Sequence, residues 1–288
     1  MPLFQEQCPV CQHLESKVLY AIAQGQLVRC QHCSLVFYTP LPSPEELVNL
    51  YETITYRDNY KNSVMADRTF AERRYQELDS ILRRYVPALL PPNHKQFLDV
   101  GCGVGDLLRA AKQNGWQITG TEIAQTAIDQ ATPDLKNKIL LGDILQLELP
   151  TNFYDVITAY HVVEHLLNPV DVLTKIYALL KPGGIAFIET PNLKGLGARI
   201  RGKDWSNIIP PEHLTYFEPA SLRYLLQQAR FSNIQIFTGS PQVVCSASAL
   251  PSLLRPAVSA LYNFAPLLNL GAALQAVAVK ANELAQPA

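Results

Sequence analysis

The segment 97–108, "FLDVGCGVGDLL", carries the pattern that decides the fold of this chain. Apolar residues around Asp99 read as a short buried strand, and glycines follow at 101, 103 and 105. The next residues, from 104 onward, have the composition of a helix. A strand that enters a helix through a glycine-rich turn lets a ligand approach the backbone closely. The segment therefore predicts an α/β fold with a ligand site at the carboxyl end of this strand.

The glycine spacing argues against a dinucleotide as that ligand. The dinucleotide pattern is G-x-G-x-x-G/A, and counting from Gly101 places Asp106 at its last position. A carboxylate there would lie at the helix N-terminus, where it would repel a pyrophosphate. The observed D-x-G-x-G-x-G pattern suits a ligand without phosphates and with a cationic amino-acid end, to which Asp99 can hydrogen-bond directly or through water.

Strands and helices alternate after residue 95, which predicts a parallel sheet covered on both faces. The expected strands are 95–100, 117–122, 138–143, 154–160 and 185–190. Helices are expected over 104–114, ended by Gly115, and over 168–180, with Asn168 as the cap and Pro169 in the first turn. A further helix over 65–85 is indicated by apolar residues at helical spacing.

Two more carboxylates stand where expected strands end. Glu122 lies 21 residues after Gly101 and can accept hydrogen bonds from both hydroxyls of a ribose. Asp143 can accept from an adenine amino group, with Ile144 against the ring. These side chains, with the glycine loop, predict a site for a nucleoside-containing ligand.

The stretch 96–192 resembles the class I S-adenosylmethionine-dependent methyltransferases. The matching segments are "FLDVGCGVGDLL", "GTEIA", "GDIL", "FYDVITAYHVVEHLLNP" and "LKPGGIAFIETPN". The resemblance implies a Rossmann-like, seven-stranded sheet whose last strands are "NIQIFTG" and "LQAVAVKA". It also implies S-adenosylmethionine as the cofactor. The residues expected to bind it are Asp99, Gly101, Cys102, Gly103, Glu122, Ile123, Asp143, Ile144 and Tyr160.

Four cysteines near the N-terminus form two C-x-x-C pairs, Cys8 with Cys11 and Cys30 with Cys33, separated by 18 residues. This spacing is typical of four-cysteine zinc sites, in which each pair forms a tight knuckle. Two disulfides are the alternative, but they would need an oxidising compartment. Zinc would contribute on the order of 10 kcal/mol to a segment too short to bury much apolar surface. We therefore expect a zinc ribbon over residues 1–40.

Charge and composition narrow the range of partners. The net charge is −1, and in the ribbon Lys17 and Arg29 are balanced by Glu6 and Glu15, so no nucleic acid is expected as a partner. The N-terminus lacks a basic and then apolar signal, so we expect a cytoplasmic protein. The longest weakly charged stretch, 239–273, is interrupted by prolines and is expected to cap the site, form a dimer face or rest on a membrane surface.

The expected organisation has three parts. They are the ribbon (1–40), a linker and helical cap (41–92), and the methyltransferase domain (93–288), which includes an acceptor-site segment (193–232) and an apolar insertion (239–273).

The segment "PPEHLTYF" contains the expected general base, His213, with Glu212 or a nearby backbone group to orient it. Together with the ribbon, this segment is similar to zinc-containing sugar C-methyltransferases of bacteria, in which an E-H-L-x-Y-F segment supplies the catalytic histidine. The chain ends soon after the methyltransferase core, whereas those enzymes carry a further C-terminal domain. A purely structural histidine packed on Tyr216 and Phe217 is the alternative role.

The segment "HVVEH" at 161–165 matches the H-x-x-E-H pattern of a class of zinc proteases. It directly follows an expected strand, and Pro169 opens the next helix, so a long zinc-binding helix has no room here. We expect His161 to face the methionine end of the cofactor or the acceptor. Glu164 and His165 are expected to fix the loop rather than to hold a metal.

The sequence thus predicts methyl transfer to a small-molecule acceptor, with a sugar, nucleotide sugar or related surface-polysaccharide metabolite as the first expectation. The alternatives are an O-methyltransferase for a quinone or lipid-linked acceptor, an RNA methyltransferase that docks through the ribbon, and a protein that binds the cofactor without catalysis.

Overall fold

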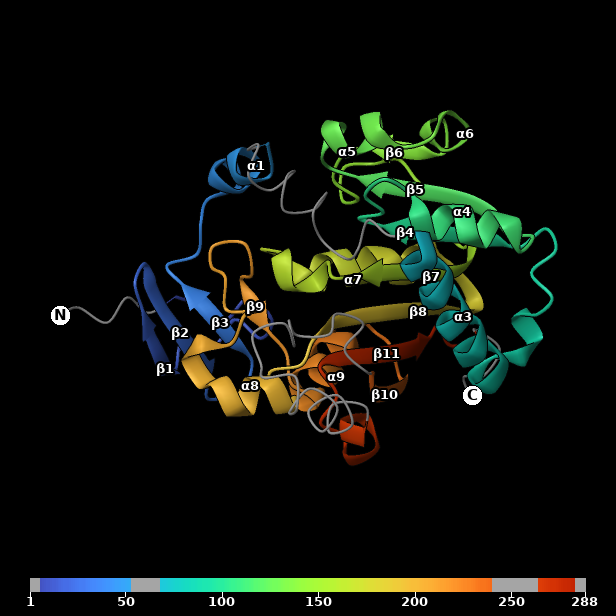
Figure 1. Ribbon diagram of the computed structural model, residues 1–288. Helices are drawn as coiled ribbons and strands as arrows, with labels where there is room; N and C mark the ends of the chain where they lie inside the picture. Colours follow the sequence, from blue (N-terminus) through green and yellow to red (C-terminus); the bar gives the residue numbers. More distant parts are fainter. Residues whose placement is uncertain (1–5, 53–67, 240–263, 283–288) are drawn as a thin grey trace, which may run out of the picture.

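A computed structural model describes residues 6–52, 68–239 and 264–282 of the chain (Figure 1). Cys245, most of the expected apolar insertion and the first residues of the expected helix 65–85 lie outside these described residues. The described part contains two sheets with the strand orders β10-β11-β8-β7-β4-β5-β6 and β1-β2-β3-β9.

The larger sheet has seven strands and carries the ligand site. The parallel strands are β4 (Gln96–Val100), β5 (Gln117–Glu122), β6 (Ile139–Leu141), β7 (Tyr154–Tyr160) and β8 (Leu180–Pro191). The antiparallel strands are β10 (Asn233–Gly239) and β11 (Ala273–Val279). Both lie where the sequence placed the last two strands, and the expected seven-stranded α/β class is confirmed.

One strand is longer than the sequence indicated. β8 begins at Leu180 rather than at residue 185, and its register with β7 shifts between the pairs Tyr154–Leu180 and Val156–Ile185. Gly183 has a φ of 77° within this shift. Gly183 and Gly184 therefore lie in a bulge inside this strand.

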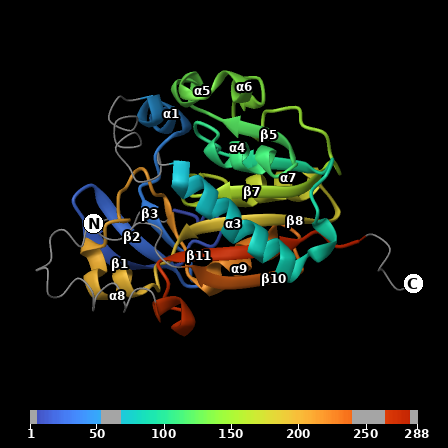
Figure 2. The same cartoon turned by 45° about the vertical axis from the view of Figure 1, so that its right-hand side comes forward.

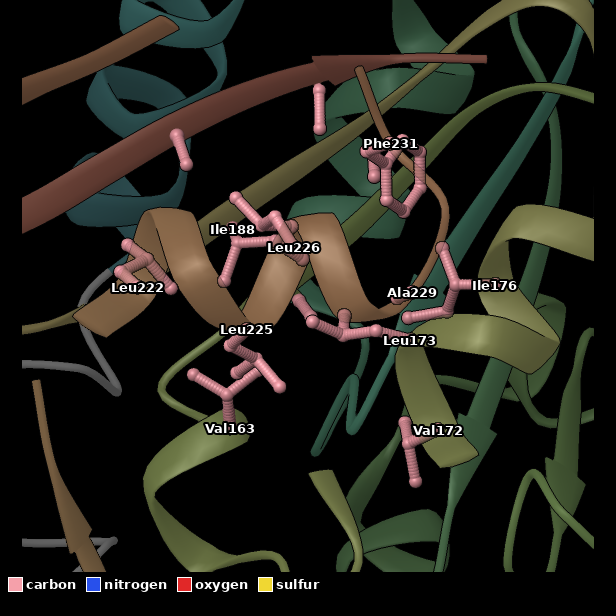
Figure 3. Packing of buried hydrophobic residues seen from close by; sticks show 14 of the residues in the cluster. Val163, Val172, Leu173, Ile176, Ile188, Leu222, Leu225, Leu226, Ala229 and Phe231 are labelled. Carbon is pink, nitrogen blue, oxygen red and sulfur yellow. The ribbon is translucent and has the colours of Figure 1, made fainter. Parts of the chain in front are cut away.

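Helices cover both faces of this sheet. On one face, α3 (Arg68–Tyr85) and α4 (Asp106–Gln113) pack with strand residues in one apolar cluster (Figure 2). On the other face, α7 (Pro169–Leu179) and α9 (Pro219–Gln228) share a second cluster, in which Leu173 and Ile176 of α7 lie along the C-terminal half of α9, with Ile176 beside Ala229 (Figure 3). The remaining helices are α1 (Pro44–Glu52), α5 (Gln125–Gln130), α6 (Pro133–Lys136) and α8 (Leu196–Arg201). Among the described residues, no helix combines the length and the apolar character needed to cross a bilayer.

The N-terminal strands do not form an isolated module. β1 (Ser16–Ile22), β2 (Gly25–Cys30) and β3 (Val36–Thr39) form an antiparallel sheet, and β9 (Thr215–Tyr216) pairs with β3 as its fourth strand. The backbone amide of Tyr38 donates to Leu214 O at 2.8 Å. Arg29 pairs with Glu218 at 2.7 Å. The segment that carries His213 is therefore held by the strands β2 and β3, which lie near the N-terminus.

The apolar face of α3 gives a test of the packing. Leu78 is fully buried on this face, as the helical spacing predicts. We expect Leu78→Ala to lower the free energy of unfolding by about 2–5 kcal/mol, through lost contacts and a cavity. Urea denaturation measures the change. The exposed Glu72 on the same helix provides the control, since Glu72→Ala should change stability by less than about 0.5 kcal/mol. Equal effects of the two substitutions would contradict this packing.

Candidate active site

The glycine loop between β4 and α4 adopts backbone conformations that favour glycine. Gly101, Gly103 and Gly105 have φ angles of 65°, 56° and 81°. A Cβ on Gly101 would lie 2.8 Å from Cγ2 of Val162, which belongs to the loop after β7. The absence of side chains thus lets the loops after β4 and β7 meet closely.

Glu122 connects the loops after β4 and β5. Its Oε2 accepts from the Gly103 amide at 2.8 Å, and its Oε1 accepts from the amides of Ile123 and Ala124 at 2.9 and 3.0 Å. The side chain is 9% exposed and lines a cleft. Each carboxylate oxygen has more than one lone-pair site, so these amides do not exhaust the acceptors of Glu122. Its expected role toward a ribose stays a prediction.

The cleft has a volume of about 150 Å³ and lies at the carboxyl ends of the parallel strands. From the loops after β4, β5 and β6 come residues that we call the glycine-loop lining: Gly101, Glu122, Ile123, Asp143 and Ile144. All five were expected at the cofactor site. The structure brings them together around one cleft, as ligand sites in α/β folds require.

Four other residues expected at the cofactor site do not line this cleft, although all four are described: Asp99, Cys102, Gly103 and Tyr160. Asp99 is buried and accepts from Thr158 Oγ1 at 2.6 Å. Burial raises the pKa of Asp99 to about 7, although the Thr158 hydrogen bond acts in the opposite direction. The assignment of these four residues to the cofactor stays a prediction.

Cys102 and Tyr160 have packing partners of their own. A Cβ on Gly120 would lie 2.6 Å from the Cys102 sulfur, so this thiol fills the space that a glycine leaves on β5. Burial raises the pKa of Cys102 well above its ordinary value, which makes it a poor nucleophile. The ring of Tyr160 lies 4.3 Å from the Arg74 guanidinium in the cluster beneath α3.

His161 joins two buried carboxylates. Its Nδ1 lies 3.1 Å from Glu164 Oε1 and its Nε2 lies 3.3 Å from Glu189 Oε1. Burial alone would lower the pKa of His161, but the hydrogen bonds to these carboxylates raise it to about 9. His161 is therefore a cation near neutral pH and fixes the loop after β7. Glu189 was not among the predicted site residues, although a glutamate at the end of an expected strand was a usable signal.

The loop after β7 and helix α7 supply a second part of the cleft, which we call the histidine lining: His161, Val162, His165, Leu166 and Val172. Apart from the two histidines these side chains are apolar. This part of the cleft therefore suits a ligand with an apolar ring or chain and few charges.

His213, the expected base, lies against the histidine lining. Its ring centroid is 4.7 Å from that of His165, and its Nδ1 lies 2.8 Å from Asn207 O. Burial lowers the pKa of His213 to about 4, so the ring is neutral near pH 7. A backbone carbonyl thus orients His213, and Glu212 instead contributes its carbonyl oxygen to His165 Nδ1 at 2.9 Å. Burial raises the pKa of the Glu212 carboxyl.

The four ribbon cysteines gather around one point. Their sulfurs all lie within 4.8 Å of one another, with 3.5 Å between Cys8 and Cys33 and 3.4 Å between Cys11 and Cys30. A tetrahedral zinc with bonds of about 2.3 Å places its sulfurs roughly 3.8 Å apart. In each knuckle the residue after the second cysteine has a φ of 62°: Gln12 in one and Ser34 in the other. The four cysteines are arranged as a zinc site requires. That they bind zinc stays a prediction.

Comparisons with known proteins agree on one family, the methyltransferases. The profile described as "Methyltransferase domain" matches residues 70–236, which is more than half of the chain. The chain is 28% identical over 177 residues to the ubiquinone biosynthesis O-methyltransferase of Paracidovorax citrulli, covering 57% of this chain and 74% of that protein. It is 31% identical over 128 residues to the protein of the same name from Albidiferax ferrireducens, covering 42% and 50%.

Solved structures share the fold at low identity. A methyltransferase from Archaeoglobus fulgidus, described as SAM-dependent, has a TM-score of 0.55 and 21% identity, covering 79% of this chain and all of that one. A [4+2]-cyclase, SpnF, has a TM-score of 0.51 and 22% identity, covering 73% and 81%. Because a cyclase shares the fold, these likenesses concern the fold and not the reaction.

Glu122 can be tested by ligand binding. We expect Glu122→Gln to weaken binding of S-adenosylhomocysteine by about 10- to 100-fold, because charge-assisted hydrogen bonds contribute about 1.5–3 kcal/mol. The amide retains an acceptor oxygen for the loop backbone. Isothermal calorimetry measures the affinity. Asp129→Asn, at an exposed position of α5, is the matched control. Unchanged affinity in Glu122→Gln would remove Glu122 from the cofactor site.

The ribbon can be tested by metal analysis. We expect Cys30→Ser to release one zinc ion per chain, because three thiolates hold zinc less well than four. The loss should also speed amide exchange at Thr215 and Tyr216, since β9 pairs with the ribbon strand β3. Elemental analysis and hydrogen–deuterium exchange report the two effects. Cys102→Ala should retain the zinc. Full zinc content in Cys30→Ser would contradict the assignment.

Proposed function

The chain belongs to the methyltransferase family whose profile matches residues 70–236, and from this premise we propose that it methylates a hydroxyl oxygen of a quinol or another phenol. It is an S-adenosylmethionine-dependent methyltransferase that acts on a small-molecule acceptor. The acceptor class is the proposed part. The observation that carries it is the composition of the histidine lining, in which apolar side chains accompany two histidines.

Two considerations favour a phenol over the sugar that the sequence first suggested. Val162, Leu166 and Val172 offer apolar contacts, whereas a sugar needs many polar partners for its hydroxyls. The relatives named above are ubiquinone biosynthesis O-methyltransferases, and the match covers 74% of the length of one and 50% of the other. A sugar acceptor remains the second candidate, because the ribbon and "EHLTYF" resemble the sugar enzymes.

In this proposal the two linings of the cleft have different roles in binding and in methyl transfer. When bound, S-adenosylmethionine supplies a methyl group on a positively charged sulfur. The glycine-loop lining would hold its nucleoside, with Glu122 toward the ribose and Asp143 toward the base. His161, fixed between Glu164 and Glu189, would keep the loop after β7 in place beside the reacting atoms. Alignment of donor and acceptor would account for much of the rate, because oriented reactants avoid an entropic cost.

Loss of the acceptor proton is assigned to the neighbourhood of His165 and His213. A phenol attacks much better as its anion, so the site must favour the deprotonated form. His213 is neutral near pH 7 but has a lowered pKa, which makes it a weak base when it acts alone. Nδ1 of His213 lies against Asn207 O, so Nε2 is the nitrogen that could accept a proton.

A transfer assay tests this proposal. The purified chain is incubated with methyl-labelled S-adenosylmethionine and a panel of reduced quinols, simple catechols, nucleotide sugars and transfer RNA. We expect label on a phenolic oxygen, identified by mass spectrometry, and at least about 10-fold less label with Glu122→Gln. Label confined to nucleotide sugars would favour the second candidate, and label confined to RNA would overturn both.

A further inference from the structure

Strand β9 and the residue before it are hydrogen-bonded to the ribbon on one side and to the loop after β7 on the other. On the ribbon side β9 pairs with β3, and the Tyr38 amide donates to Leu214 O at 2.8 Å (Figure 1). On the opposite side the Leu214 amide donates to Glu164 O at 2.8 Å. Thr215 Oγ1 donates to Val163 O at 3.3 Å. A single short strand therefore connects the ribbon to the loop after β7.

The loop that receives these bonds forms part of the cleft. His161, Val162 and His165 line the cleft, on either side of the two bonded residues. Val162 also lies close to the glycine loop, where a Cβ on Gly101 would be 2.8 Å from its Cγ2. A displacement of β9 would therefore move residues that line the cleft, and a ligand that fixes those residues would hold β9 in place.

The cysteines hold the ribbon end of this connection. Cys30 is the last residue of β2, and Cys33 stands three residues before Val36, the first residue of β3. The Cys30 amide donates to Leu35 O at 2.9 Å. Three of the four cysteines lie in the same apolar cluster as Phe217, the residue after β9. An ion bound to the four sulfurs would fix the start of β3, and with it the pairing of β9.

A buried carboxylate just after β9 reinforces the connection. Glu218 is 4% exposed, and its two oxygens lie 2.7 Å from Arg29 Nη2 and 3.0 Å from Lys194 Nζ. Arg29 also donates to Ser34 O at 3.1 Å, in the second knuckle of the ribbon. Glu218 is the N-cap of α9 as well. One carboxylate thus joins the knuckle, the start of α9 and the loop after β8.

We propose that zinc in the ribbon and the cofactor in the cleft strengthen each other's binding through β9, with Thr215 and Glu218 as positioning residues. In one state β9 is bonded on both sides, and in the other it is released from the loop after β7. Zinc favours the first state because it fixes β3. The cofactor favours it because the cleft is lined by that loop. The inference does not depend on the class of acceptor.

Competition for zinc tests the linkage on the zinc-loaded chain. A chromophoric chelator of known zinc affinity is titrated with and without saturating S-adenosylhomocysteine. We expect S-adenosylhomocysteine to tighten zinc binding by about 5-fold or more, as is typical of coupled sites. Because linkage between two binding equilibria is reciprocal, calorimetry should show that removal of zinc weakens S-adenosylhomocysteine binding by the same factor.

Two substitutions should weaken the linkage without removing a cysteine or a residue that lines the cleft. Glu218→Gln removes the charge that holds Arg29 and Lys194. Thr215→Val removes the hydroxyl that bonds to Val163 O, with little change in volume. Each should reduce the coupling factor by at least about 2-fold, as expected for the loss of a single hydrogen bond.

Matched variants serve as controls. Thr215→Ser retains the hydroxyl and should retain the wild-type factor. Arg83→Gln breaks an exposed ion pair with Asp79 on α3, far along the chain from β9, and should also leave the factor unchanged. A ribbon that only stabilised the fold would leave the affinity for each ligand independent of the other. The proposal is overturned if S-adenosylhomocysteine does not change the zinc affinity of the wild type, or if Glu218→Gln and Thr215→Val both keep the full factor.

Hydrogen–deuterium exchange decides the matter if the zinc-free chain does not fold, because it needs only the zinc-loaded chain. S-adenosylhomocysteine should slow exchange at the amides of Cys30 and Ser34 in the ribbon, as well as in the loop after β7. The slowing at the ribbon should be smaller in Glu218→Gln. Protection confined to the cleft in the wild type would overturn the proposal.

Discussion

The carboxylate of Glu122 is the interaction on which the geometry of the cleft depends. It accepts hydrogen bonds from three backbone amides, one in the glycine loop after β4 and two at the end of β5. Backbone amides that face a cleft need partners, and a single buried carboxylate satisfies all three. The adjacent strands β4 and β5 therefore present their loops in one fixed arrangement. Glu122 is also the residue that the sequence predicts to accept hydrogen bonds from a ribose.

A second constraint is the joining of the two sheets. β9 belongs to the methyltransferase part of the sequence, yet it completes the ribbon sheet by pairing with β3. The ion pair of Arg29 with Glu218 reinforces this junction, and Glu218 is 4% exposed. His213 lies two residues before β9, so the ribbon supports the segment that packs against the histidine lining. This arrangement gives the ribbon a structural task that does not involve nucleic acid.

In the loop after β7, the roles of the residues in one short motif depend on the surrounding structure. "HVVEH" resembles a protease signature, but in the structure only three of its residues form a single 3-10 turn. His161 is used to neutralise Glu164 and Glu189, while His165 turns toward His213. The histidine that completes the cluster comes from a segment 48 residues further along the chain. A cluster of side chains divided in this way has no recognisable spacing in the sequence.

The sequence by itself determined the larger sheet, its strand boundaries within a few residues except at the start of β8, and the five cleft residues of the glycine-loop lining. These features are local, because strand composition, glycine positions and strand-end carboxylates follow one another along the chain. The two cysteine pairs could also be recognised in the sequence, since a knuckle is a local motif. Only the tertiary structure decided which residues meet from distant segments: β9 against β3, His165 against His213, and Glu189 against His161. Such contacts depend on how elements pack, and periodicity along one segment carries no information about the segment that faces it.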